Sequence, residues 1–273
     1  MADSASLPQE FRIALRIAGI RLRGQMAYRA SFWMQIVSNF IIHFAEVMAL
    51  FAMFYRFDNM GGWTLGDVAF LHGISMLAFS LGDTIAVGLD SVPGQIRLGE
   101  FDSVLIRPLS SWVQAIVSEV SLRHLGQLIQ GALILAFSFT IVDIEWTVAK
   151  AAMLIVAIIT GVALYIGLFT VVAILSFWTV NSIEAVNAFT YGGSDLAQFP
   201  LHIFQRWMRS LFMFVIPVAF TAYFPALFIL DKDDPLGFPH WVRFIGPIPV
   251  AIFCLVVAWG WRQGIRHYRS TGS

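Results

Sequence analysis

Long apolar stretches alternate with short polar ones along most of the chain. A bilayer's hydrocarbon core is about 30 Å thick, so a helix needs about 20 apolar residues to cross it. Apolar runs of that order lie near residues 32–55, 68–89, 113–141, 148–178, 210–230 and 244–262. The pattern therefore predicts six transmembrane helices. The fourth is the clearest, because residues 151–178 include no charged side chain.

Three of the predicted spans carry features that complicate a simple crossing. The third includes Arg123 and His124, so its first turns are expected at or below the membrane interface. Prolines interrupt the fifth span and open the sixth, and such breaks persist at membrane depth only where protein or a wet cavity satisfies the freed backbone groups. An element inserted only halfway, around 222–246, is therefore an alternative there.

Composition supports an integral membrane protein. The 273 residues are 58% hydrophobic and only 12% charged, whereas a soluble domain has about 25% charged residues. Such a chain is too apolar for disorder, and 17 basic against 17 acidic residues leave no excess charge for nucleic-acid binding. The single cysteine, Cys254, allows neither an internal disulfide nor a cysteine-based zinc site. We expect one all-α membrane domain over residues 1–273.

The distribution of basic residues predicts the orientation. With both termini inside, thirteen arginines fall in cytoplasmic segments and four basic residues fall outside, which the positive-inside rule associates with cytoplasmic termini and an even number of spans. The cytoplasmic set is Arg12, Arg16, Arg21, Arg23, Arg29, Arg97, Arg107, Arg123, Arg206, Arg209, Arg262, Arg266 and Arg269, and the outer set is Arg56, Lys150, Lys232 and Arg243.

The segment before the first span, residues 1–31, has an amphipathic pattern. Arg12, Arg16 and Arg23 fall on one helical stripe among apolar residues, as in a helix that lies on the membrane surface. Arg21 falls on the opposite side. The segment is therefore predicted to be an N-terminal interfacial helix, with a simple basic anchor as the alternative.

The loop at 91–110, between the second and third spans, is predicted to hold a short helix. Ser91 can cap it, Pro93 suits its first turn, and Pro108 ends it. Its apolar face would be Ile96, Phe101, Val104 and Leu105, with Glu100 and Asp102 beside Phe101. Such a helix could rest on lipid headgroups, but two carboxylates next to an apolar side chain favour a basic protein partner over an anionic leaflet.

This loop resembles the coupling region of ABC-2 type transporter permeases, especially the short six-span, viologen-exporter-like members. The resemblance rests on Gly99-Glu100-Phe101-Asp102 and Leu105-Ile106-Arg107-Pro108-Leu109-Ser110, and it extends over nearly the whole chain. Further matching segments are Tyr28-Arg29, Gly62-Trp63-Thr64-Leu65-Gly66-Asp67, Phe199-Pro200-Leu201, Ile216-Pro217, Phe224-Pro225-Ala226 and Tyr268-Arg269-Ser270-Thr271-Gly272-Ser273.

The resemblance implies a type V exporter-like membrane domain in the bacterial cytoplasmic membrane. Such a permease pairs with a second copy or a sister chain and with two ATP-binding subunits, which carry the ATP and magnesium. The residues that would contact the ATP-binding subunit are Ile96, Gly99, Glu100, Phe101, Asp102, Leu105, Arg107 and Pro108. The chain itself contains only two lysines, Lys150 and Lys232, and neither follows a glycine-rich phosphate loop. No bound cofactor is expected on this chain, and no catalytic constellation is recognisable.

Polar residues within the first two spans are candidates for a substrate pathway, since ionisable groups at membrane depth are costly. Gln35, Asn39, His43 and Glu46 share one helical face of the first span, and His72, Ser80 and Asp83 share a face of the second. They could line the path and attract a cationic or amphipathic substrate. They could equally pair between helices, and no ligand spacing supports a metal site.

Three functions remain open from the sequence. The first is an ATP-driven exporter permease for an amphipathic or hydrophobic substrate, such as a drug, antibiotic, lipid or glycolipid. The second is a proton-coupled secondary transporter that uses Glu46, Asp83 and His43, although no inverted repeat is visible. The third is a structural membrane partner within a larger complex.

Overall fold

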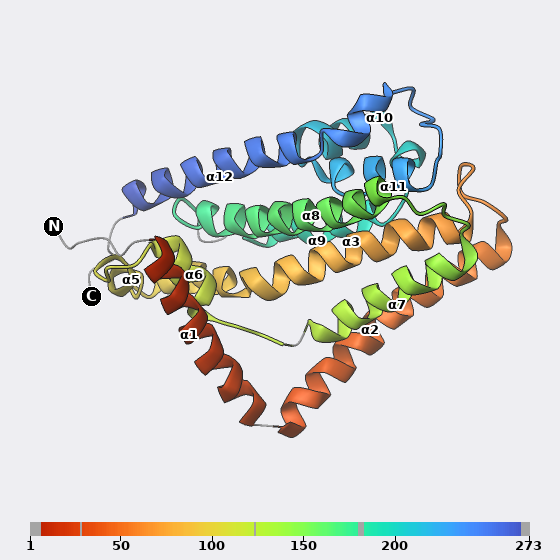
Figure 1. Ribbon diagram of the computed structural model, residues 1–273. Helices are drawn as coiled ribbons and strands as arrows, with labels where there is room; N and C mark the ends of the chain where they lie inside the picture. Colours follow the sequence, from red (N-terminus) through yellow and green to blue (C-terminus); the bar gives the residue numbers. More distant parts are fainter. Residues whose placement is uncertain (1–6, 28, 123, 180–182, 269–273) are drawn as a thin grey trace.

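The computed structural model describes residues 7–27, 29–122, 124–179 and 183–268, and within these ranges it is built of helices without a strand (Figure 1). The long helices are α1 (Leu7–Ala27), α2 (Arg29–Arg56), α3 (Leu65–Ala86), α7 (Leu125–Ile141), α8 (Val148–Leu175), α9 (Ile183–Ala197) and α12 (Pro247–His267). The shorter ones are α4 (Val92–Arg97), α5 (Asp102–Leu105), α6 (Ser111–Ser118), α10 (Arg206–Ser210) and α11 (Tyr223–Ile229), with single helical turns η1 (Val87–Ser91), η2 (Leu201–Ile203), η3 (Leu211–Val215), η4 (Val218–Phe220) and η5 (His240–Phe244).

Helix α3 is the centre of the bundle and packs between α7 and α8. Glycines permit the close approach: a Cβ at Gly73 would lie 2.9 Å from the Cα of Leu135, and one at Gly82 would lie 2.8 Å from the Cβ of Tyr165. Small residues at helix interfaces are the usual means of association inside a bilayer, where lipid is as apolar as the side chains. The sequence around α3 thus specifies a buried central helix.

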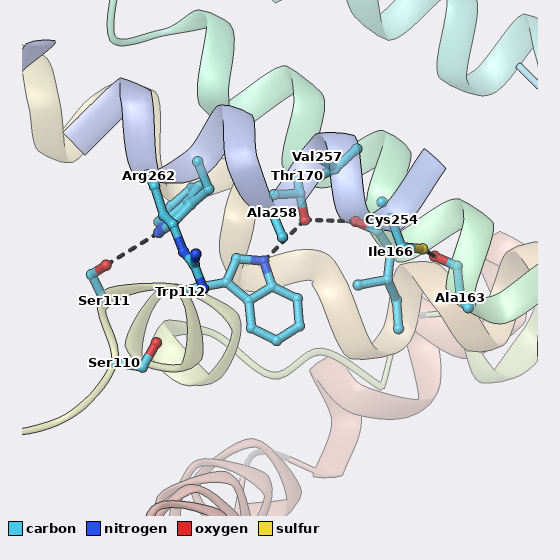
Figure 2. Close-up of a pocket in the computed structure, with 12 residues that line it drawn as sticks. Ser110, Ser111, Trp112, Ala163, Ile166, Thr170, Cys254, Val257, Ala258 and Arg262 are labelled. Atoms are coloured by element: carbon cyan, nitrogen blue, oxygen red, sulfur yellow. Dashed lines mark hydrogen bonds between the residues drawn. The ribbon is translucent and has the colours of Figure 1, made fainter. Parts of the chain in front are cut away.

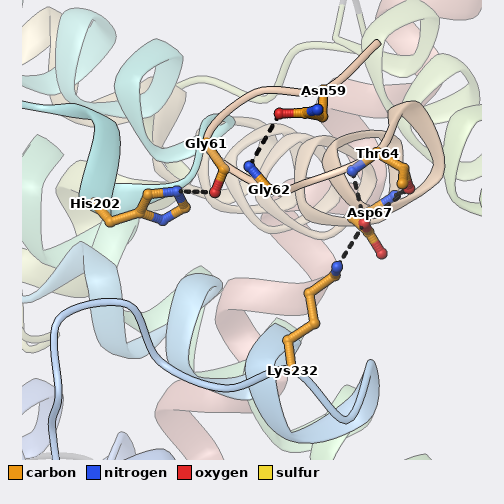
Figure 3. Close-up of polar contacts among 7 residues, drawn as sticks. All are labelled: Asn59, Gly61, Gly62, Thr64, Asp67, His202 and Lys232. Carbon is orange, nitrogen blue, oxygen red and sulfur yellow. Dashed lines mark hydrogen bonds and ion pairs between the residues drawn. The ribbon is translucent and has the colours of Figure 1, made fainter.

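Two ion pairs hold one end of the bundle, which we call the Trp63 end. Thr64 and Asp67 form a capping box at the start of α3, and Asp67 also pairs with Lys232 at 2.9 Å (Figure 3). Lys150, at the start of α8, pairs with Asp231. The ring of Trp63 stacks on Tyr223, with 5.7 Å between centroids. Segments far apart in the sequence are thereby fixed together.

The opposite end, which we call the Phe101 end, is joined by aromatic rings. Phe101 contacts both Phe177 and Tyr268, with ring centroids 5.3 Å apart in each case. Phe177 follows α8 and Tyr268 follows α12. The described parts of both chain termini lie at this end in Figure 1.

The apolar helices agree with the sequence in part. Four are long and apolar enough to cross a membrane: α2, α3 with its continuation to Arg97, α8 and α12. The predicted third span, 113–141, is wrong as a single helix, because α6 ends at Ser118 and α7 begins at Leu125. Helix α7, at 17 residues, is about 26 Å long. The broken backbone finds a partner in Gln25, which donates to the Val120 carbonyl and accepts from the Leu122 amide at 3.2 Å.

The predicted fifth span, 210–230, is also wrong as a single crossing. Two helical segments, Arg206–Val215 and Val218–Ile229, meet at a 75° bend. The first begins just after His202, which contacts the Gly61 carbonyl at 2.9 Å, and the second carries Tyr223, which stacks on Trp63. Both ends of the bent pair therefore lie at the Trp63 end, so it enters and leaves the bundle on the same side. The half-inserted element expected at 222–246 overlaps this hairpin, which begins earlier along the chain.

Helix α9, which the apolar pattern did not predict, makes the fifth pass along the bundle. The chain leaves α8 beside Phe101 and reaches His202 at the Trp63 end. Between them, Tyr191 contacts Phe79 and Phe169, and the Ala197 carbonyl accepts from Ser75 at 2.8 Å. Within the described residues, α3, α8 and α12 run along the bundle between the two ends, whereas α2 begins away from the Phe101 end (Figure 1).

This path changes the charge count. Arg206 and Arg209, which the sequence placed on the cytoplasmic side, follow His202 at the Trp63 end, and the Arg209 Nε donates to the Phe204 carbonyl at 2.6 Å. Moving two residues turns thirteen against four into eleven against six. The segments assigned to the cytoplasm still carry more basic residues than the outer ones. The positive-inside rule therefore still favours the Phe101 end as cytoplasmic.

Cysteine labelling tests the path of the chain, because Cys254 is the single cysteine and can be replaced by alanine. Asp58→Cys and Arg206→Cys are expected to react alike with a membrane-impermeant maleimide added to intact cells. Leu98→Cys, at the Phe101 end, is expected to behave oppositely. If Arg206→Cys were instead accessible from the same side as Leu98→Cys, the bent pair would be a crossing and the assigned path would fail.

Candidate functional site

A polar face on α2 meets polar residues of two other helices. His43 Nδ1 lies 2.9 Å from a carboxylate oxygen of Glu46, and 47% of the Glu46 side chain is exposed. His72, on α3, is buried, and neither ring nitrogen has a hydrogen-bond partner among the described residues. His72 is close enough to His43 and Glu46 for their charges to interact. Of the α3 residues predicted from the sequence, His72 therefore lies near the α2 pair.

Asp195, on α9, is a fourth titratable member that sequence reasoning missed. It lies close enough to Glu46 and His43 for an electrostatic interaction, and its residue is exposed. An exposed carboxylate deep in an apolar bundle is costly in lipid unless it faces water or protein. The Gly192-Gly193-Ser194-Asp195 stretch is the signal that could have drawn attention to this helix, because such polarity is unusual between two apolar runs. We call His43, Glu46, His72 and Asp195 the polar cluster.

The remaining polar residues of the expected pathway have other neighbours. Gln35 contacts Ser31 at 3.2 Å, and the Asn39 amide oxygen accepts from the Gln127 backbone at 3.1 Å. Gln35 and Asn39 also line a shallow depression of about 520 Å³ on α2, with Ser31, Met34, Ser38 and Ile42. Gln35 is therefore exposed, whereas Asn39 is half-buried against the start of α7.

Asp83 has a different position from the polar cluster. It pairs with His124 at 3.2 Å, and both side chains are almost fully buried between α3 and the start of α7. A buried, paired carboxylate joins helices, so the geometry favours the packing alternative for Asp83. Within the described residues, no group of three or more His, Cys, Asp or Glu side chains could hold a metal ion.

The 91–110 segment, which the sequence singled out, is two helical turns rather than one capped helix. Ser91 does not cap: its backbone is helical, and its hydroxyl donates to the Gly88 carbonyl at 2.7 Å. Helix α3 therefore continues through η1 into α4. The chain then breaks at Gly99, whose φ of +71° is a conformation that glycine adopts at little cost, and α5 follows.

Phe101 holds this segment to the bundle rather than facing outward. Its side chain is 0% exposed and lies between Phe177 and Tyr268. Burial raises the pKa of the Tyr268 phenol, and the neighbouring Asp102 carboxylate adds to that rise. In this conformation the apolar side chain expected to meet a partner is instead buried within the chain, and Ile96 is buried beside it.

The surface left for a partner lies around this anchor. Glu100, Leu105, Arg107 and Pro108 are exposed, and Ile106 is the most exposed apolar side chain of the segment at 84%. A cavity of about 420 Å³ separates the segment from α1 and α6, and Glu100, Arg107 and Pro108 line it together with Ile13 and Arg21. The segment thus presents apolar and charged groups on a rigid base.

Replacing Phe101 by alanine should destabilise the protein strongly. Emptying a buried phenylalanine site costs about 3–5 kcal/mol of the free energy of unfolding, whereas Ile106→Ala, at an exposed site of the same segment, should cost less than about 0.5 kcal/mol. Thermal unfolding in detergent compares the two. Equal midpoints for both variants would show that Phe101 does not anchor the segment.

The family described as "ABC-2 family transporter protein" matches residues 40–272. No curated protein and no solved structure gives a significant match. The match covers most of the chain, including the segment at 91–110, the polar cluster and the bent hairpin. The chain belongs to the ABC-2 transporter family and is a multi-pass membrane permease component of an ABC transporter.

Proposed function

We propose that this chain is the permease subunit of an ATP-driven exporter and forms the substrate pathway as a dimer. The permease class follows from the family. The observation that carries the finer proposal is the 91–110 segment, an exposed surface on a base that is fixed to the ends of α8 and α12 through Phe101. A partner that pushes on this surface would move the bundle itself.

Two ATP-binding subunits are the proposed partners of this surface. Glu100 and Arg107 would pair with their charged groups, and Leu105, Ile106 and Pro108 would supply the apolar contact. Gly99 allows the turn between the two halves of the segment, and Asp102 supports it next to Tyr268. ATP and magnesium would be bound by those subunits, which would supply the energy.

The pathway is proposed to run along the polar cluster at an interface between two permease chains, identical or sister. The exposure of Glu46 and Asp195 on the side of the bundle supports this pathway. A second chain, with water between the two, would remove both carboxylates from lipid. The substrate would be amphipathic or hydrophobic.

Six membrane crossings with both termini in the cytoplasm complete the proposal. The four helices that are long enough and apolar enough to cross a membrane, the further helices α7 and α9, and the excess of arginines in the predicted cytoplasmic segments support it. Helix α1 would lie at the inner membrane surface, where its arginines and exposed apolar residues suit an interfacial position. The proposed location is the bacterial cytoplasmic membrane.

Charge reversal at Glu100 tests the coupling role. Glu100→Arg should lower co-purification of the ATP-binding subunits by about tenfold or more, because the reversal would place like charges opposite each other across the interface, which costs several kcal/mol. Arg97→Glu, an exposed reversal in the neighbouring helix α4, serves as the control and should retain the partner. Recovery of the ATP-binding subunits with Glu100→Arg at the wild-type level would refute this contact.

A proton-coupled secondary transporter remains the second candidate, because the polar cluster gathers four titratable side chains. The two functions differ in their energy source. In sealed vesicles, an exporter requires ATP, whereas a proton-coupled transporter continues without ATP and stops when the proton gradient is dissipated. Transport that follows the gradient alone would favour the second candidate.

A further inference from the structure

A cavity lies away from the polar cluster, between α6, α8 and α12 (Figure 2). Its volume is about 630 Å³, within the range of about 300–1,000 Å³ typical of small-molecule sites. Ser110, Ser111 and Trp112 come from the start of α6, Ala163, Ile166, Gly167 and Thr170 from α8, and Cys254, Val257, Ala258, Trp261 and Arg262 from α12.

The cavity is polar at one end and apolar at the other. Arg262 and the two serines are at the end nearer the Phe101 end of the bundle. Ala163 and Cys254 lie deeper: eight residues of helix separate Cys254 from Arg262, which corresponds to about 12 Å. A molecule with a polar head and an apolar chain fits this gradient along the membrane normal.

The indoles in the cavity already have their hydrogen-bond partners within the chain. Trp112 donates to the Thr170 hydroxyl, and Trp261 donates to the Ser111 hydroxyl, each at 3.1 Å. The indole N–H groups of the cavity walls therefore have hydrogen-bond partners within the protein, and the walls present apolar surfaces to the cavity. A ligand needs to supply only apolar contact there.

The polar end, by contrast, carries uncompensated positive charge. Arg262 lines the cavity. Arg266 lies one helical turn beyond it, four residues along the same face of α12, and both arginines are exposed. Neither forms an ion pair or a hydrogen bond with another residue in the described part of the chain. Two adjacent guanidinium groups repel each other, and a phosphate between them would remove the repulsion while accepting paired hydrogen bonds.

We propose that this cavity binds an anionic phospholipid from the adjacent leaflet, with its phosphate at Arg262 and Arg266 and one acyl chain along Ile166 and Val257 toward Cys254. Basic pockets between transmembrane helices commonly bind anionic headgroups. The site is separate from the substrate pathway and from the surface for the ATP-binding subunits, so it does not depend on the proposed exporter function.

Cys254 provides a direct probe, because it is the single cysteine of the chain and lines the deep end of the cavity. The purified full-length protein is reconstituted in nanodiscs of phosphatidylglycerol or of phosphatidylcholine with the same acyl chains. The rate of Cys254 modification by N-ethylmaleimide is then measured by intact mass. Each arginine near an anionic lipid surface contributes about 1 kcal/mol, so phosphatidylglycerol should slow the reaction by about fivefold or more.

The dependence on the arginines identifies the headgroup site. Arg262→Gln together with Arg266→Gln should abolish the difference between the two lipids, whereas Arg97→Gln, an exposed arginine at the same end of the bundle, should preserve it. Folding is checked by size-exclusion chromatography and thermal unfolding. Equal labelling rates of the wild-type protein in both lipids, or a difference that survives the double substitution, would overturn the proposal.

Native mass spectrometry gives a second measurement that requires no reaction at the thiol. The wild-type protein, extracted in mild detergent, should retain phosphatidylglycerol, and the double variant should lose it. Retention of an anionic amphiphile that is not a phospholipid would assign the cavity to a transported molecule and would overturn the assignment to a membrane lipid.

Discussion

Close packing of helix backbones around α3 is the constraint on which the rest of the structure depends. Inside lipid, apolar side chains gain little by leaving the membrane for one another, so association rests on van der Waals contact and on satisfied polar groups. Gly73 and Gly82 bring α7 and α8 against α3, and Gly161 of α8 brings Ala78 and Thr221 close. Helix α3 thereby positions the start of the 91–110 segment, the bent hairpin and the inner side of the polar cluster.

The two ends of this core are held by different chemistry. Ion pairs of Asp67 with Lys232 and of Lys150 with Asp231 hold the Trp63 end, and edge-to-face ring contacts around Phe101 hold the other. Partly buried ion pairs are costly to leave unpaired, and a fully buried ring is costly to remove. The aromatic junction lies at the end where a partner is proposed to act, and the ion-paired junction closes the opposite end.

Apolar periodicity was sufficient to identify α2, α3, α8 and α12, because a run of about 20 apolar residues has few alternatives to a membrane helix. It failed at α9, where Thr190, Ser194 and Asp195 interrupt the apolar pattern although the helix packs along α3 and α8. It also misread the bent hairpin. Hydropathy shows that the segment is apolar, and Pro217 indicates a break in the helix. The direction in which the chain returns after the break depends on contacts with Gly61 and Trp63, which hydropathy does not predict.

The candidate site was predictable to a similar degree. The positions of His43 and Glu46 on one face of α2 followed from helical spacing, and their contact is present. His72 lies near His43 and Glu46, whereas Asp83 pairs with His124. Which partner each residue has depends on the helices that pack against α3, and a single sequence does not reveal that packing. Phe101 illustrates the same limit, since a phenylalanine between two carboxylates has the pattern of an exposed contact, yet rings more than 70 residues away along the chain bury it.

This permease is proposed to work as one part of an ATP-driven complex. The most direct test is to isolate the tagged chain from its native membrane in mild detergent and to determine the composition and stoichiometry of the complex by intact-mass analysis. We predict two permease chains, identical or sister, with two ATP-binding chains. Recovery of the permease without any nucleotide-binding partner, under conditions that preserve the permease dimer, would contradict the account.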